Sequence, residues 1–185
     1  NQLSTISYKE KEKKCRLATK NFLYTLWNNY QNRIEWDNPQ DSKECKAIIV
    51  KCAKLLSKLR SAKEESDGNV QKYKTEKPDR INQLFYNLCR GHALVCGRNQ
   101  INNDDLRFII KLSIDSAPPF QSSLFKALMN NGGQITTSQA ITILDRTRPI
   151  AQERMDILTD LKLCYSKRDK KGLVGGAEEM ICLSE

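Results

Sequence analysis

Residues 132–163 read GGQITTSQAITILDRTRPIAQERMDILTDLKL, and residues 164–183 continue as CYSKRDKKGLVGGAEEMICL. Threonine is a common helix N-cap, so Thr136 and Thr137 predict a short helix that extends to about Leu144. A few residues later, Pro149 opens a second helix at a position where its missing N–H costs nothing. The stretch therefore predicts two helices separated by a tight turn.

Short β-prone runs lie on both sides of this pair of helices. Residues 134–136 can form one strand, and the runs at 163–166 and 180–183 flank a basic, glycine-containing loop. With a further amphipathic helix over 120–130, the order of elements is helix, strand, helix, helix, hairpin. This is the order of a winged helix-turn-helix, so we predict such a domain at 117–185, with a small β-hairpin as its wing.

Apolar residues at spacings of three and four predict four more helices upstream, in a helical subdomain that covers residues 1–116. The first helix spans 8–34, and the third begins at Pro78. The polar segment 61–77 has little periodicity, so we expect a mobile surface loop there. Together with 117–185, the chain is predicted to be mainly α. The apolar stripes of the four helices are Leu23, Trp27, Tyr30 and Ile34; Ile48, Cys52, Leu55, Leu56 and Leu59; Ile81, Leu84, Phe85, Leu88, His92, Val95 and Cys96; and Leu106, Ile109, Ile110 and Ile114.

The composition of the 185-residue chain is typical of a soluble globular protein, with 39% hydrophobic and 29% charged residues. No run approaches the ~20 apolar residues that cross a bilayer, so no membrane partner is expected. The seven cysteines are odd in number and form no C-x-x-C pair, which favours reduced, buried thiols and a cytoplasmic location. Because His92 is the only histidine, the sequence predicts neither a zinc site nor a hydrolytic triad.

The net charge of +9 favours a polyanionic partner, but the basic residues are unevenly placed. The predicted winged domain is nearly neutral, since residues 118–185 contain nine Lys and Arg against eight Asp and Glu. Within it, residues 162–171 hold five cations and one acid. Upstream, Lys51, Lys54 and Lys58 follow one helix face, which either is simply solvated or contacts phosphate.

If the second helix of the quoted stretch is a recognition helix, its N-terminal end presents free N–H groups and a cation to DNA. Two acids on its outward face, Glu153 and Asp156, oppose deep insertion into a groove. We therefore expect weak, mainly backbone-directed binding of double-stranded DNA with low specificity. By side-chain chemistry, Gln152 suits adenine, and Arg154 or Arg148 suits guanine. The candidate DNA-binding residues are Thr147, Arg148, Gln152, Arg154, Lys167, Arg168, Lys170 and Lys171.

A second resemblance comes from residues 78–112, which read PDRINQLFYNLCRGHALVCGRNQINNDDLRFIIKL. This segment resembles the lid subdomain of AAA+ ATPases of the minichromosome-maintenance and magnesium-chelatase branch. Those lids consist of an arginine-led helix, a Gly-Arg pair, a short hydrophobic segment, an acidic cap and a further helix. A winged helix directly after the lid is also found at the C-terminus of archaeal replicative helicases. The resemblance covers roughly residues 8–163.

The resemblance implies that residues 1–116 are lid-like and that Arg80 is the sensor-2 arginine that reaches the γ-phosphate of ATP. A guanidinium suits that role because it is always charged and grips phosphate oxygens in pairs. The alternative is a surface arginine beside Asp79. The resemblance to AAA+ lids also implies that an upstream AAA+ domain binds ATP and magnesium. That domain and its ring neighbours would be partners of the chain.

The chain itself contains no phosphate-binding loop and no acidic magnesium motif, so we expect no enzymatic activity from it alone. It begins at Asn1, and we expect it to be the C-terminal, non-catalytic portion of a longer helicase-like ATPase. Two alternatives remain: a stand-alone dimeric transcription regulator of the winged-helix type, and a winged helix that contacts only protein.

Overall fold

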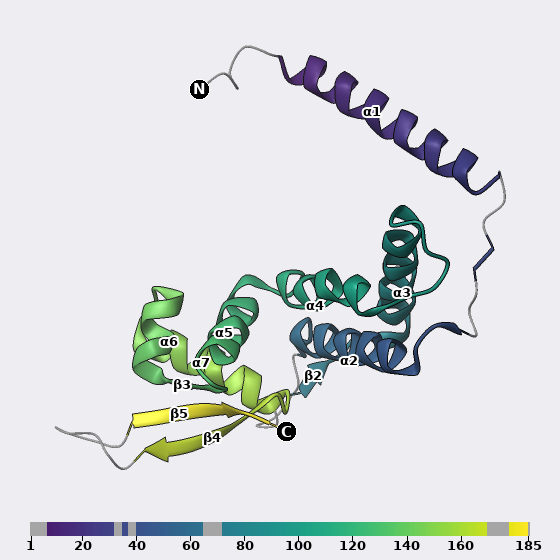
Figure 1. Ribbon diagram of the computed structural model, residues 1–185. Helices are drawn as coiled ribbons and strands as arrows, with labels where there is room; N and C mark the ends of the chain where they lie inside the picture. The colour runs from purple at the N-terminus through teal and green to yellow at the C-terminus, as the bar shows by residue number, and fades with distance from the viewer. Residues whose placement is uncertain (1–6, 32–34, 37–39, 65–71, 170–177, 185) are drawn as a thin grey trace.

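The computed structural model of the protein is mainly helical, with a small three-stranded antiparallel sheet and a two-stranded hairpin (Figure 1). It describes residues 7–31, 35–36, 40–64, 72–169 and 178–184. The α-helices are α1 (Tyr8–Asn29), α2 (Lys43–Leu59), α3 (Pro78–Val95), α4 (Leu106–Asp115), α5 (Pro119–Asn130), α6 (Thr137–Leu144) and α7 (Arg148–Asp160), and a 3-10 turn covers Asn103–Asp105. The strands are β1 (Ala62–Glu64), β2 (Lys72–Lys74), β3 (Gln134–Thr136), β4 (Cys164–Asp169) and β5 (Glu178–Leu183).

The N-terminal half of the body is built from α2, α3 and α4, which pack on one another through apolar faces. On α3 the buried row is Ile81, Phe85, Cys89 and Ala93. The predicted stripe of α3 is therefore wrong in part: Leu84, Leu88, Val95 and Cys96 are exposed. The predicted row and the buried row both contain Ile81 and Phe85, and both have helical spacing. The row with small residues at its C-terminal end is the one that faces α2 and α4, and small side chains allow helices to approach closely.

The segment between α3 and α4 is fixed by the buried carboxylate of Asp105. Two nitrogens of the Arg98 guanidinium donate to it at 2.7 and 2.8 Å, and the backbone N–H of Asn102 donates at 2.8 Å. His92 Nδ1 lies 2.6 Å from the same carboxylate. Burial by itself would raise the pKa of Asp105, but these hydrogen bonds outweigh it and hold the pKa below its usual range. Asn102 and Asp105 also form a capping box at the 3-10 turn that leads into α4.

A second buried carboxylate, Asp41, ties the start of α2 to the same segment. It accepts hydrogen bonds from the Ile101 backbone N–H at 2.8 Å, from Trp36 Nε1 at 3.0 Å and from the Tyr86 hydroxyl. Arg90 lies over the Trp36 ring at 4.9 Å. The turn after α3 is therefore held by two separate buried acids.

The C-terminal half places α5, α6 and α7 against a sheet of strand order β3-β5-β4. Ile135 of β3 pairs with Ile181 of β5, and both side chains are buried in the core. Gly132 and Gly133 make the turn from α5 into β3 with φ of +66° and +85°, a region that favours glycine. The elements predicted for 119–183 are confirmed, and the two hairpin strands are longer than predicted, since they reach Asp169 and begin at Glu178.

Thr136 caps α6 as predicted, in a capping box with Gln139. The predicted tight turn follows at Asp145, whose φ of +51° closes the helix. Pro149 lies in the first turn of α7. The buried face of α7 consists of Ala151, Met155 and Leu158, each with 0% exposure.

The prediction of a loop over the whole of 61–77 is wrong. β1 and β2 form an antiparallel hairpin, and residues 65–71 between them lie outside the described part of the chain. The base of the hairpin is closed by the Ser61 and Thr75 hydroxyls, 2.8 Å apart, and by a hydrogen bond from Ser57 to the Glu76 carbonyl. Three-residue strands of mostly polar residues carry no alternating apolar pattern, so periodicity could not reveal them.

Helix α1 stands apart from the body, to which it is joined at its C-terminal end (Figure 1). It ends at Asn29 rather than at the predicted residue 34, and Ile34 lies outside the described residues. None of the described residues of α1 is buried. Beyond the helix, the Tyr30 hydroxyl donates to the carbonyls of Leu94 at 2.9 Å and Arg98 at 3.4 Å. Of the predicted apolar stripe, Leu23 and Trp27 are exposed, and only Tyr30, just after the helix, reaches another described element.

The cysteine prediction is confirmed for five of the seven thiols, which are free and buried, and is wrong for Cys15 and Cys96, which are exposed. Burial raises the pKa of Cys89 and of Cys164 to about 12, so these two thiols stay protonated at neutral pH. No helix in the described ranges combines the length and the apolar composition that a membrane span requires.

Candidate nucleic-acid interface

The N-terminal tip of α7 is the part of the predicted DNA-binding surface that is most open. Thr147 is the N-cap residue in extended conformation, and no side chain caps the helix. Thr147 and Arg148 are both exposed, as is the preceding Arg146. The first-turn N–H groups of a helix have no intrahelical acceptors and lie at the positive end of its dipole. The tip therefore offers N–H donors and two guanidinium groups to an anion. Arg146 is not among the residues predicted from the sequence, because it lies in the tight turn and reaches the tip only when α6 and α7 pack together.

The hairpin β4–β5 supplies one described cation, Lys167, whose side chain is exposed and whose register partner is Met180. Beside it, Ser166 donates a hydrogen bond of 2.6 Å to Glu179. The backbone of Arg168 belongs to β4, but its side chain lies outside the described residues. Lys170 and Lys171 also lie outside them, so their predicted contacts stay predictions.

Gln152 is engaged within the protein. Its amide nitrogen donates to Glu179 at 2.9 Å and to Asp156 at 3.0 Å, and its oxygen accepts from the Thr137 hydroxyl at 3.3 Å. The amide therefore links α7 to β5 and to α6. Reading adenine requires both ends of the amide, so the predicted contact would break these three hydrogen bonds.

Arg154 does not lie on the exposed face of α7 either. Its guanidinium stacks on the Phe120 ring of α5 at 5.1 Å, and Arg146 approaches the same ring at 5.8 Å. The Nε of Arg154 is buried and has no hydrogen-bond partner among the described residues. The side chain of Arg154 packs on α5, because a long side chain can lie along an apolar surface while it keeps its charge. Its predicted contact with guanine stays a prediction.

The outward face of α7 is acidic along its length, with Glu153, Asp156 and Asp160 exposed. Tyr73 of β2 donates a hydrogen bond of 3.1 Å to Asp160. Burial and then these three carboxylates raise the pKa of Tyr73 to about 12. Phosphates approaching this face meet like charge, and the β1–β2 hairpin touches its C-terminal end. A duplex can thus contact α7 favourably only near its N-terminal tip.

Arg80 is placed as predicted at the start of α3, with 84% of its side chain exposed. Its partner is Glu76, at 3.0 and 3.2 Å, rather than Asp79. An exposed ion pair of this kind is worth at most about 1 kcal/mol, so it can open at little cost.

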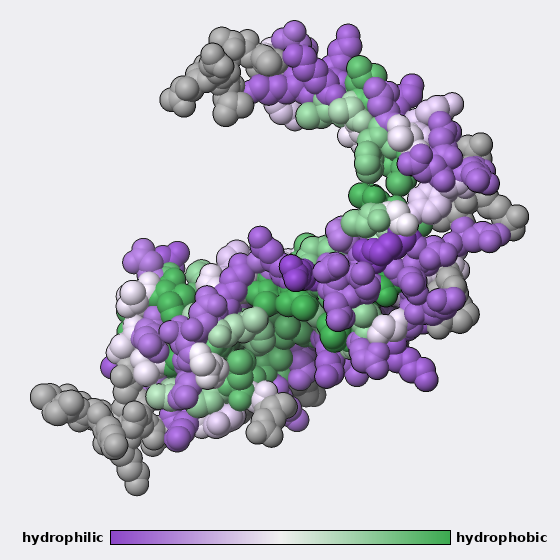
Figure 2. All heavy atoms as spheres, viewed as in Figure 1, coloured by the Kyte–Doolittle hydropathy of each residue, from purple (hydrophilic) through white to green (hydrophobic). Residues whose placement is uncertain are grey.

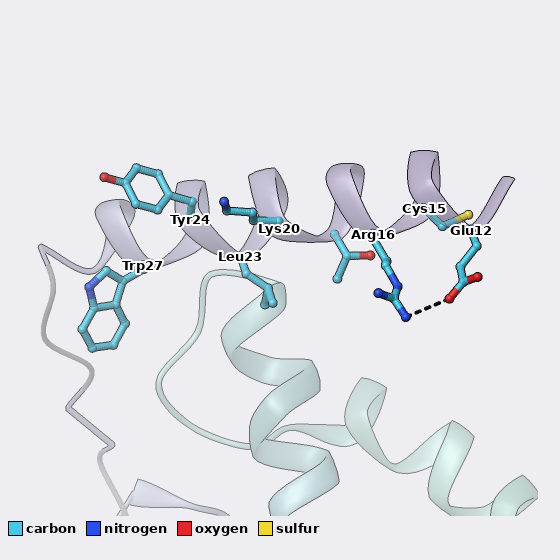
Figure 3. Close-up of a pocket in the computed structure, with 8 residues that line it drawn as sticks. Glu12, Cys15, Arg16, Lys20, Leu23, Tyr24 and Trp27 are labelled. Atoms are coloured by element: carbon cyan, nitrogen blue, oxygen red, sulfur yellow. Dashed lines mark ion pairs between the residues drawn. The ribbon is translucent and has the colours of Figure 1, made fainter. Parts of the chain in front are cut away.

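A hollow of about 670 Å³ follows one face of α1, from Glu12 to Trp27 (Figure 3). Leu23 and Trp27 point to the same side of the helix, and Arg16 pairs with Glu12 at 2.8 Å. Figure 2 shows apolar residues along the side of α1 that faces the body. The hollow has no second wall, which distinguishes it from a closed ligand pocket. Among the described residues, no group of three or more His, Cys, Asp or Glu side chains is gathered for a metal.

Comparison of the chain with protein-family models, with curated proteins and with solved structures yields no match.

Proposed function

We propose that residues 117–185 form a winged helix-turn-helix that binds double-stranded DNA weakly and mainly through its backbone. The observation that carries the proposal is the arrangement of elements: α5, β3, α6, α7 and a hairpin, with β5 at the centre of the sheet. This arrangement puts the exposed, uncapped tip of α7 and the β4–β5 hairpin on one module. It is the arrangement by which winged helices offer a recognition helix and a wing together.

When the domain binds DNA in this way, the tip of α7 and Lys167 of the wing contact phosphates, and few side chains contact the bases. Thr147 and Arg148 supply a backbone donor and a cation. Gln152 is occupied by Glu179 and Asp156, and Arg154 is stacked on Phe120, so neither supports specificity. Contacts restricted to phosphates give binding that depends on salt and hardly on sequence.

We further propose that the chain is the C-terminal, non-catalytic portion of a helicase-like AAA+ ATPase, with α2–α4 as its lid. The support is the lid-like sequence 78–112 and the exposure of Arg80 at the start of α3, where its side chain is open to a neighbouring domain. ATP and magnesium would belong to the upstream domain.

A winged helix that contacts only protein is the second candidate, and the acidic face of α7 favours it. Within the chain, the Tyr73 hydroxyl donates a hydrogen bond to Asp160 on this face, so a partner's hydrogen-bond donors could pair with its other carboxylates in the same way. The two candidates differ in their response to a polyanion, because only the first requires phosphate contacts.

The test is fluorescence anisotropy with a labelled random-sequence duplex over a series of salt concentrations. We expect a linear fall of log affinity with log salt, and a slope reduced by about 0.9 for each phosphate contact removed in Arg148→Ala and Lys167→Ala. Lys43→Ala, an exposed lysine at the start of α2, is the charge-matched control and should leave the slope unchanged. Absence of binding to duplex DNA at low salt would overturn the DNA function and leave the protein-contact candidate.

Sedimentation of the same sample separates a monomer from the dimer that a stand-alone regulator requires.

A further inference from the structure

A groove with lysines on its rim lies where α2 meets the C-terminal module. It encloses about 620 Å³ between the exposed side of α2 and the residues that begin β4 and end β5. Lys51, Lys54 and Lys58 of α2 line it, and Lys162 lines it from the turn after α7. The Lys58 ammonium lies 3.5 Å from the Lys162 carbonyl, so the two walls approach each other at this point.

The positive charge of the groove is not neutralised locally. None of the residues that line it is acidic, and no ion pair involves its four lysines among the described residues. A concave surface that carries one sign of charge attracts groups of the opposite sign more strongly than a convex one. The lysine row of α2, which the sequence left open between a solvated face and an anion-binding one, thus becomes one wall of a groove.

The floor of the groove is apolar. It is lined by Leu55 of α2, by the half-buried Leu163 just before β4 and Leu183 at the end of β5, and by the almost buried ring of Phe125 of α5. Lysine side chains extend the apolar surface further, because their methylene stems lie along it while the ammonium groups stay in water. A ligand that fits must therefore be apolar on one side and anionic along its edges.

We propose that this groove binds a segment of a partner protein in which Leu, Ile or Phe residues are flanked by Asp and Glu. Charge complementarity selects the acids, and the leucine floor selects the apolar residues. A nucleic-acid strand fits less well, since strand binding relies on exposed aromatic rings for base stacking, and Phe125 is only 9% exposed. The groove is also remote from the DNA-binding tip, because α7 separates Arg148 from Lys162 by about 20 Å. Its function is thus additional to the proposed DNA contact.

The experiment is a selection from a random peptide library displayed on phage, with the whole chain as the immobilised target. A parallel selection uses the Lys54→Glu, Lys58→Glu double variant as counter-target. We expect peptides enriched in both acidic and large apolar residues, selected by the wild type and not by the double variant. For a synthesised member of this set, affinity should fall about tenfold or more in the double variant.

Two further variants test whether peptide binding depends on the groove itself or only on the positive charge of the protein. Leu55→Ser should weaken binding of the selected peptide about tenfold although no charge changes. Lys43→Glu, about 18 Å from Leu55 toward the N-terminus of α2, should change the affinity less than twofold. Circular dichroism of each variant reports whether its fold is intact. The proposal is overturned if no peptide set distinguishes the wild type from the double variant, or if Leu55→Ser leaves affinity unchanged. It is also overturned if an oligothymidylate binds the groove lysines while no such peptides are selected, because the groove would then belong to nucleic acid.

Discussion

Helices α1 and α7 are both amphipathic, yet only one of them is part of a core. α1 has 22 residues and none of them is buried among the described residues, whereas α7 has 13 and buries Ala151, Met155 and Leu158 completely. Helical periodicity identifies an apolar face in each case. A sequence pattern therefore predicts a helix and its apolar face, whereas the rest of the fold decides whether another element covers that face.

The two helices also differ in what stabilises them. α1 has local support, because Ser7 caps it and Arg16 pairs with Glu12 one turn away. It is also longer than the ~12–15 residues below which isolated helices are marginal. α7 is near that limit and its N-terminus is uncapped, so its stability depends on packing. Four substitutions compare the packed body, which includes α7, with the separate helix α1, in order of decreasing expected effect.

The largest effect is expected from Asp105→Asn, in the packed body. The substitution removes a buried carboxylate and leaves the Arg98 guanidinium without its two charged hydrogen bonds. Breaking a buried pair in this way costs about 3–5 kcal/mol of unfolding free energy. Urea unfolding at neutral pH measures it, and a loss below about 1 kcal/mol would contradict the role assigned to Asp105.

The same variant gives a test in acid. The folded pKa of Asp105 lies below its ordinary value near 3.8, so its stabilisation is present above that value and is lost as the pH falls through the folded pKa. Below about pH 4 the wild type should therefore lose more stability than Asp105→Asn, which cannot titrate at this position. Other acids titrate in both proteins and cancel in the difference. Parallel stability curves would mean that Asp105 is not held ionised by Arg98.

The next largest effect is expected from Leu158→Ala on α7. Leu158 is fully buried, so its truncation leaves a cavity and should cost about 2–5 kcal/mol. Leu23→Ala on α1 is the matched control, since Leu23 is 54% exposed. Urea unfolding of the pair measures the comparison directly, and equal losses would contradict it.

Tyr73→Phe should have a smaller effect, because it removes one hydrogen bond to Asp160 and leaves the ring in place. The expected cost is about 0.5–1.5 kcal/mol. Amide exchange should rise near the C-terminal end of α7, where the β1–β2 hairpin touches it, and should stay unchanged in α1. Faster exchange in α1 would show that the two regions are coupled.

The smallest effect is expected from Trp27→Ala on α1. Its side chain has no described element over it, so the unfolding free energy should change by less than about 0.5 kcal/mol. Tryptophan fluorescence provides an independent measurement, since Trp27 should emit as a solvated indole while Trp36 emits as a half-buried one. A loss as large as that of Leu158→Ala would show that α1 packs on the body in solution.

The candidate site was only partly predictable. Thr147 and Arg148 are exposed at the tip of α7 as the sequence indicated, because helix ends are read from local capping signals. The positions of Gln152 and Arg154 were not predictable in this way. Gln152 is held by Glu179, 27 residues away, and Arg154 by Phe120, 34 residues away. The partners of a long polar side chain are set by groups that are distant in the sequence and come close only in the folded protein.

The positions of the helices and strands of 119–183 and the N-cap at Thr136 follow from the sequence alone, because local capping signals and side-chain periodicity indicate them. Tertiary structure alone decided which apolar row of α3 is buried, and it left the stripe of α1 uncovered. It also decided the lysine-rimmed groove, where the Lys58 ammonium approaches the Lys162 carbonyl across a separation of 104 residues. Local periodicity fixes the direction of side chains on each element, whereas burial and charge clustering follow from how the elements pack.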